Sequence, residues 1–220
     1  ATYFSKAYIR RSLPLMLCSR KLSITTETSE LAATSKSYYD SEDAQTFYSK
    51  IWDNDTIHIG RYDLLSADET ARLSKVQQIR RAEDLHEVEF TKLIRSTFPS
   101  EQNPQGLRIL DLGCGYGGML RRLWNDDLVW TAVGCDISTK MCEQARRLNA
   151  ELSTVAAEEI SINEASYLDI NTHTGINTSE LIPVKRDSMD LVISMDALLH
   201  VGPEGQRKAM LEAARALRPG

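Results

Sequence analysis

The stretch Asp111–Gly118 reads DLGCGYGG and overlaps the end of the apolar run LRILDL at residues 107–112. This pattern is typical of a buried strand that ends in a tight turn. Glycines there let a ligand approach the backbone, and the following helix directs its N–H groups at that ligand. Gly113, Gly115 and Gly118 fit G-x-G-x-x-G, the dinucleotide fingerprint. The stretch also fits D-x-G-x-G-x-G, so its glycines alone do not select one nucleotide cofactor.

Strand-like and helix-like patterns alternate around this loop. Apolar runs predict strands at 107–112, 130–135, 160–165 and 189–195, with helices between them, and Pro203 begins a last helix in its favoured first turn. Such alternation predicts an α/β fold with a Rossmann-like doubly wound parallel sheet. Four strands are fewer than the usual five or six, so we expect that C-terminal strands are missing from this sequence.

Three regions are expected along the chain. Residues 106–220 form the β/α core, which is incomplete at its C-terminus, and residues 38–105 form an N-terminal helical cap. The cap is predicted to hold one helix near 43–52 and a second over 66–98, which begins with a capping box.

Residues 1–37 form the third region, which is either a transit peptide or a disordered arm. The first 26 residues contain five Lys or Arg, seven Ser or Thr and no acid, a composition typical of an organellar transit peptide. We therefore expect an intracellular protein. It is cytoplasmic, or mitochondrial or plastid-located if these residues are a transit peptide.

The overall composition narrows the class of protein. A chain of 220 residues with 42% hydrophobic residues can form one ordinary domain with an additional arm. No apolar run approaches the roughly 20 residues that span a bilayer, and a net charge of −5 disfavours broad nucleic-acid binding. The four cysteines form no C-x-x-C pair and no histidine lies at ligand spacing, so we expect reduced thiols and no metal site.

Acidic residues on either side of the loop favour S-adenosylmethionine over NAD. Asp136 ends the second predicted strand, where a carboxylate can accept the hydroxyls of an adenosine ribose in either cofactor. Asp111 precedes the first glycine by two residues, where an acid attracts the α-amino group of S-adenosylmethionine. Tyr167 is placed to stack on adenine, although it also fits an ordinary core position. The other residues expected to contact the cofactor from these turns are Gly113, Cys114, Gly115, Ile137 and Ser166.

The N-terminal segment Tyr38–Tyr62 reads YYDSEDAQTFYSKIWDNDTIHIGRY, which is unusually aromatic for a plain helical cap. Together with the glycine loop, it resembles the sarcosine/dimethylglycine N-methyltransferases of glycine-betaine synthesis. In that family, Y-Y-D-S-x-D-A-x-x-F-Y-x-x-I-W-G-G-E-D-I-H-I-G-x-Y precedes the cofactor domain. The resemblance covers roughly residues 38–220. It departs from the family at residues 53–56, where D-N-D-T replaces G-G-E-D.

The resemblance implies a site for methyl transfer to a small amine. Phosphoethanolamine methyltransferases share the general layout, which implies catalytic roles for Tyr39, Asp196 and His200, with Tyr38 as the alternative tyrosine. His200 is the histidine placed to take a proton from the amine. It can also be read as a surface histidine that caps the connection between strand and helix.

The same resemblance implies contacts to both reactants. Ile57 and His58 would touch the methionine end of S-adenosylmethionine, and Tyr38, Trp52 and Tyr62 would bind the substrate. Aromatic faces can hold a methylated, cationic amine by cation–π attraction. Trp52 also fits a purely structural role, in which it packs the first helix on the sheet.

Other functions remain compatible with the sequence. The first alternative is a methyltransferase for phosphoethanolamine, a sterol or a fatty-acyl chain, although IWDNDTIHIG at residues 51–60 favours the betaine type. The second alternative is an NAD-dependent oxidoreductase. The third is a fragment that binds S-adenosylmethionine and is inactive.

Overall fold

The computed structural model describes residues 25–52, 55–166 and 182–219. Its centre is a four-stranded sheet in the order β3-β2-β1-β4, in which neighbouring strands are parallel. The predicted strands and their parallel direction are confirmed, although the fourth strand is shorter than the predicted range 189–195. The strands are β1 (Leu107–Leu112), β2 (Val129–Asp136), β3 (Ile160–Glu164) and β4 (Leu191–Ile193).

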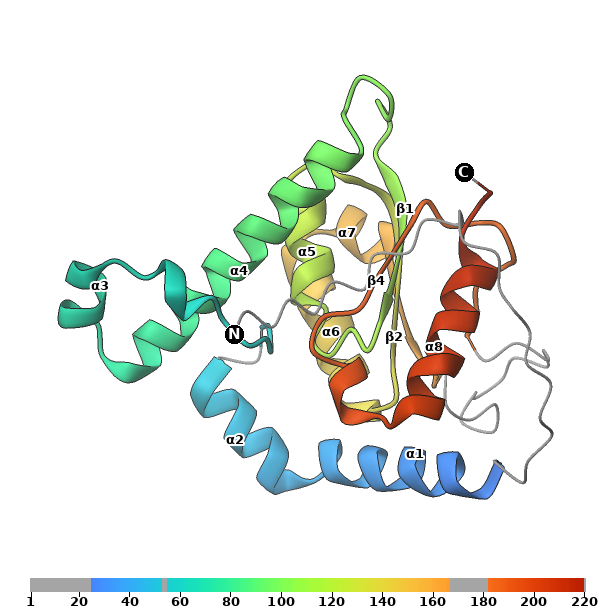
Figure 1. Cartoon of the computed structure of the whole chain (residues 1–220), viewed down its shortest axis with the longest axis horizontal. Coiled ribbons are helices and arrows are strands. Elements are labelled where there is room, and N and C mark those ends of the chain that lie inside the picture. Colours follow the sequence, from blue (N-terminus) through green and yellow to red (C-terminus); the bar gives the residue numbers. More distant parts are fainter. Residues whose placement is uncertain (1–24, 53–54, 167–181, 220) are drawn as a thin grey trace.

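Side chains of β1 alternate between two apolar cores, because successive residues of a strand point to opposite faces. Leu107 and Ile109 join the core under α5, α6 and α7, whereas Leu110 and Leu112 join the core under α8. Figure 1 shows these helices on opposite sides of the sheet, which is the predicted doubly wound arrangement. Pro203 lies in the first turn of α8, as predicted. The helices are α5 (Gly118–Asn125), α6 (Thr139–Leu152), α7 (Thr154–Glu159) and α8 (Pro203–Ala216).

Two of the helices that precede the sheet in sequence, α1 and α2, lie across the carboxyl ends of its strands, below the sheet in Figure 1, whereas α4 lies beside α5. Residues 30–52 and 55–60 are called the arm below. The elements of this N-terminal half are α1 (Thr25–Tyr39), α2 (Glu42–Trp52), the 3-10 turn η1 (Tyr62–Leu64), α3 (Ala67–Arg72) and α4 (Lys75–Thr97).

Two features of this half differ from the sequence predictions. Helix α1 begins at Thr25, within a region where no helix was expected before residue 43. The helix predicted over 66–98 is two helices, because Ser74 begins a second capping box with Gln77. The apolar spacing continues across this break, so periodicity alone did not reveal it.

The last part of the arm, residues 55–60, is called the strap and lies along α4 and α5. It connects α2 to η1 and brings the arm against the core. Its polar groups pair with three residues of these helices: Arg121 donates to the Asp55 carbonyl (2.7 Å), Glu87 accepts from the Thr56 hydroxyl (3.0 Å) and Glu83 accepts from the His58 amide (2.7 Å).

Some predictions concern residues outside the described ranges. The transit-peptide prediction falls largely on residues 1–24, and Tyr167 also lies outside the described residues. No helix among the described residues is both long enough and apolar enough to cross a membrane.

Gly60 is the position where the strap comes closest to α4. A Cβ atom at Gly60 would lie 2.5 Å from both the carbonyl carbon and the Cβ of Ala82. We expect Gly60→Ala to lower the free energy of unfolding by about 1–3 kcal/mol, because the strap must move away from a packed helix. Urea denaturation measures this change.

The matched control for that substitution is Gly202→Ser. No atom lies within 4 Å of the Cβ position of Gly202, and this residue is the N-cap of α8, where serine is favoured. Its free energy of unfolding should stay within about 0.5 kcal/mol of the wild type. Equal stability of the two variants would contradict the close packing of the strap.

Candidate functional site

A cavity of about 290 Å³ lies between the carboxyl ends of the strands and the arm. Ligand sites in open α/β sheets are found at this edge, because the connecting loops diverge there. The structure therefore brings together residues from both halves of the sequence. The predicted site residues that line the cavity are Tyr39, Trp52, Ile57, His58, Gly113, Gly115, Asp136, Ile137, Ser166, Asp196 and His200.

The glycine loop forms the turn between β1 and α5. Gly113 and Gly115 have φ angles of 78° and 53°, in the left-handed region that favours glycine. Gly113 also lacks room for a side chain, because a Cβ atom there would lie 2.3 Å from the Ala197 Cβ. Sequence and structure thus agree that these positions require glycine.

Asp136 holds this turn against the end of β2. Its carboxylate accepts hydrogen bonds from the backbone amides of Gly115 and Ser138, both at 2.9 Å. Burial raises the pKa of Asp136, and the two backbone hydrogen bonds oppose that rise. The carboxylate therefore organises the cavity wall in addition to facing the cavity.

Asp111 is buried beneath the same turn. Its side-chain oxygen Oδ1 has no hydrogen-bond partner, and the residue is 3% exposed. Burial, together with the nearby charge of Asp136, raises the pKa of Asp111 to about 8. The charge of a bound cation would favour the ionised form of this carboxyl group and bring its pKa down again. Asp111 does not itself line the cavity.

His58 projects from the strap into the cavity wall. Both ring nitrogens are buried without a hydrogen-bond partner, and Nε2 lies 3.7 Å from a Glu87 oxygen, beyond hydrogen-bond length. Burial, and to a lesser extent the charge of His86, lowers the pKa of His58 to about 4. The ring is therefore neutral near pH 7, so one ring nitrogen can donate a hydrogen bond and the other can accept one.

Tyr39, Asp196 and His200 line another part of the cavity wall. His200 lies in the 3-10 turn η3 (Leu198–His200), and its ring contacts Tyr39 edge-on at a centroid distance of 6.3 Å. Asp196 has a φ angle of 55° and accepts a hydrogen bond from the Ile59 amide at 2.6 Å. This hydrogen bond joins the strap to the loop after β4.

Aromatic rings of α2 extend this wall. Tyr48 stacks on Tyr39 at 6.1 Å and contacts Trp52 at 5.6 Å, and Phe47 contacts Trp52 at 5.8 Å. Phe47 and Tyr48 were not predicted as site residues, although the motif that revealed Trp52 contains both. Because Phe47 and Tyr48 are adjacent in a helix, the sequence did not indicate that both rings line the cavity.

Other predicted residues lie outside the cavity. Tyr38 is 53% exposed and does not line the cavity, although it contacts the lining residues Tyr39, through its ring, and Tyr48, through a side-chain hydrogen bond. Tyr62 is 48% exposed on η1. Cys114 is buried behind the loop. Substrate binding by Tyr38 and Tyr62, and cofactor binding by Cys114, therefore have no support from direct contact with the cavity.

Metal ligands do not gather anywhere in the described part of the chain. No group of three or more His, Cys, Asp or Glu side chains there could hold a metal ion. Cys114, Cys135 and Cys142 are buried thiols that form no disulfide. The cavity instead offers buried carboxylates, neutral donors and aromatic faces.

Comparison with known proteins identifies the class of this fold and site. Residues 109–220 match the family model of the methyltransferase domain. The chain therefore belongs to the methyltransferase-domain family, and its sheet is the Rossmann-like fold of class I methyltransferases.

Individual relatives have more specific names than the family model. The chain is 32% identical to a dimethylglycine N-methyltransferase of Parasynechococcus marenigrum (strain WH8102), over 83% of this chain and 54% of that protein. It is 30% identical to a sarcosine/dimethylglycine N-methyltransferase of Aphanothece halophytica, over 89% of this chain and 58% of that protein. These relatives confirm the family resemblance inferred from the aromatic segment 38–62.

A solved structure also resembles this chain, and its name refers to the same group of methyltransferases. The crystal structure of a candidate sarcosine dimethylglycine methyltransferase from Galdieria sulphuraria superposes with a TM-score of 0.61 at 26% identity. The alignment covers 82% of this chain and 56% of that chain. The chain thus spans little more than half the length of the relatives that it matches.

The raised pKa of Asp111 predicts a pH dependence of stability. Its folded pKa of about 8 lies above the ordinary value of 3.8, so the folded state binds the proton more tightly than the unfolded state. The stabilisation is complete below about pH 4 and is lost as the pH rises through about 8. We expect ligand-free Asp111→Asn to lack this loss, which is on the order of 5 kcal/mol because each pKa unit between the two states corresponds to about 1.4 kcal/mol.

Urea denaturation between pH 4 and pH 8.5 measures that difference, with Asp127→Asn as the control. Asp127 is exposed at a φ angle of 56°, which asparagine also adopts. The control should follow the wild-type curve. If Asp111→Asn follows it as well, the carboxylate is not the source of the pH dependence.

Proposed function

We propose that this chain carries the cofactor-binding and acceptor-binding parts of an S-adenosylmethionine-dependent N-methyltransferase that acts on sarcosine or dimethylglycine. The observation that carries the proposal is the cavity itself, which places the glycine turn opposite an aromatic and acidic arm. The named activities of the relatives support the same reaction.

The residues on the core side fit S-adenosylmethionine. Its α-amino group is a cation, which suits the unpaired Oδ1 of Asp111 beneath the turn. Gly115 leaves open the space that a side chain would fill, and Asp136 can still accept ribose hydroxyls beside its two backbone hydrogen bonds. Ser166 also lines the cavity, and the proposal places the adenine beside it.

The residues on the arm side fit an amine that becomes cationic. Among the described residues that line the cavity, none is Lys or Arg, whereas Asp136 and Asp196 are acids. Tyr39, Tyr48 and Trp52 add aromatic faces, each able to attract a cation by roughly 0.5–2 kcal/mol. Trp52 Nε1 is a buried donor without a partner, and it is suited to an oxygen of the acceptor.

The reaction needs mainly positioning and one proton acceptor. The cofactor, when bound, would supply an electrophilic methyl group on its sulfonium. Attack by a neutral amine nitrogen would form the N–C bond as the S–C bond breaks, and S-adenosylhomocysteine would be the leaving group. The arm orients the amine and excludes water, which converts a two-molecule encounter into a reaction within one complex. His200, held beside Tyr39, takes the proton that the amine must lose, and the Ile59 hydrogen bond keeps Asp196 at the same wall.

Calorimetry with S-adenosylhomocysteine and NAD tests the cofactor. We expect the first to bind and NAD not to bind, and we expect Asp111→Asn to weaken S-adenosylhomocysteine at least about tenfold, because an ammonium loses its ionic partner. Labelled S-adenosylmethionine should then transfer methyl to sarcosine or dimethylglycine and not to phosphoethanolamine. Binding of NAD alone would refute the cofactor, and transfer only to phosphoethanolamine would refute the acceptor.

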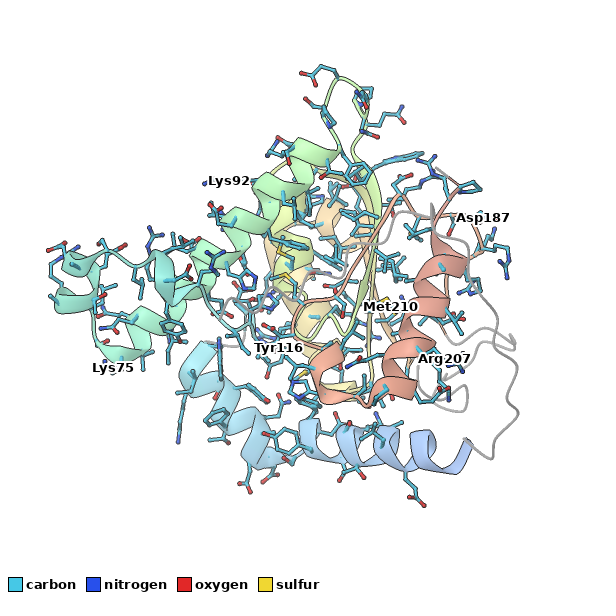
Figure 2. The ribbon with its side chains drawn as sticks, in the orientation of Figure 1. Lys75, Lys92, Tyr116, Asp187, Arg207 and Met210 are labelled. Carbon is cyan, nitrogen blue, oxygen red and sulfur yellow. The ribbon has the colours of Figure 1, made fainter. Side chains whose placement is uncertain are left out.

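His200→Gln tests the proton acceptor. We expect kcat to fall about 10²–10⁴-fold, the usual contribution of a general base, with the affinity for S-adenosylhomocysteine changed less than about threefold. The control is Arg207→Ala on α8, labelled in Figure 2, which breaks an exposed ion pair with Glu204 and should leave both quantities unchanged. A wild-type kcat in His200→Gln would assign the proton to another group.

A further inference from the structure

Lys36 of α1 reaches into the core beside the proposed cofactor site. Its ammonium donates hydrogen bonds to the Ile137 carbonyl at 3.1 Å, to the Thr139 hydroxyl and to the Glu164 carboxylate at 2.7 Å. Ile137 and Thr139 follow the end of β2, and Glu164 ends β3. One arm side chain therefore ties together two adjacent strand ends.

Asp40, just after the end of α1, adds a second set of contacts to the same turn. Its carboxylate accepts hydrogen bonds from the Ser138 hydroxyl at 2.6 Å and from the Lys140 amide at 3.1 Å, and it lies 3.2 Å from Lys36. Burial works against ionisation here, yet the hydrogen bonds from Ser138 and Lys140 and the charge of Lys36 lower the pKa of Asp40. The carboxylate thus stays ionised where it caps the start of α6.

Ser138 connects these contacts to the cofactor side. It is fully buried, its hydroxyl donates to Asp40 and its amide donates to the Asp136 carboxylate. The arm therefore holds, through one residue, the acid that is placed to bind the ribose. The same helix α1 contributes Ser35 and Tyr39 to the cavity wall, so its attachment decides whether that wall is in place.

We infer that Lys36 and Asp40 form a clamp that closes α1 over the adenosine half of the cofactor and slows cofactor release. The inference rests on the proposed function, since it takes the cavity as the S-adenosylmethionine site. Lys36 and Asp40 are positioning residues, because their contacts are to the β2–α6 turn and to each other. The ligand can leave only after these contacts to Ile137, Ser138 and Lys140 break.

The experiment measures association and dissociation rates of S-adenosylhomocysteine by surface plasmon resonance for Lys36→Met, Asp40→Asn and the double variant. We expect each single variant to dissociate about tenfold faster with little change in association, as for loss of a charged hydrogen bond. The double variant should equal the faster single variant, because both side chains act on one turn. Arg147→Met, which breaks the exposed ion pair with Glu151 on α6, should retain the wild-type rates.

A second measurement requires no bound ligand. Hydrogen exchange of the ligand-free chain should show lost protection at the Lys140 amide in Asp40→Ala, which removes the acceptor oxygen, with the amides of β1 and β2 still protected. That pattern distinguishes an opened clamp from general unfolding. It also keeps the inference testable if a variant is too unstable for rate measurements.

The outcomes separate the clamp from the proposed function. If the unmodified chain binds no S-adenosylhomocysteine, the proposed function fails, whereas exchange at Lys140 still reports whether the clamp exists. If the unmodified chain binds and both clamp variants dissociate at its rate, the proposed function stands and the clamp inference is wrong. Equal acceleration in Arg147→Met would also overturn the clamp, because any lost surface charge would then have the same effect.

Discussion

The hydrogen bonds of the Asp136 carboxylate join the parts of this protein that form the cavity. One oxygen holds the Gly115 amide of the glycine turn, and the other holds the Ser138 amide at the start of α6. Through the Ser138 hydroxyl the same chain of contacts reaches Asp40 on the arm. Loss of this acid would remove the hydrogen bonds that connect the glycine turn to the β2–α6 turn and, through Ser138, to the arm. Asp111, one strand away, has no such partners, and this leaves a demand for positive charge at the site.

The core and the arm are held by different forces. The sheet is packed between two apolar clusters, so its geometry depends on burial and is insensitive to ionic strength. The arm attaches through a small apolar cluster, in which Leu31 and Ala32 of α1 pack against Val201, and through polar contacts at separate points. These polar contacts include Lys36 to Glu164, Ile59 to Asp196 and Gln45 to the Tyr116 hydroxyl, labelled in Figure 2. Such contacts break and form more readily than a packed core, as entry and exit of a covered ligand require.

The sequence predicted the sheet better than the arm, for a physical reason. Buried parallel strands are short apolar runs, and their carboxyl ends meet at one edge, so Asp111, Asp136 and Asp196 could be placed near one another from their order alone. Helix α1 has no long apolar stripe in TTETSELAATSKSYY, and it is held by the small apolar patch of Leu31 and Ala32 and by long-range contacts of Lys36 and Asp40. The path of the backbone between motif residues was equally unpredictable. Trp52 therefore reaches the cavity, whereas Tyr62, in the same motif, does not.

The division of the cavity walls between the two halves of the chain has a consequence for how such proteins diverge. The groups that face the proposed cofactor lie on strand ends that also hold the core together, so they are costly to change. The aromatic rings Tyr39, Phe47, Tyr48 and Trp52 come from one continuous stretch of fewer than twenty residues. Under the proposed function, exchange of that single segment between homologues would change the methyl acceptor while the residues on the methyl-donor side are inherited intact.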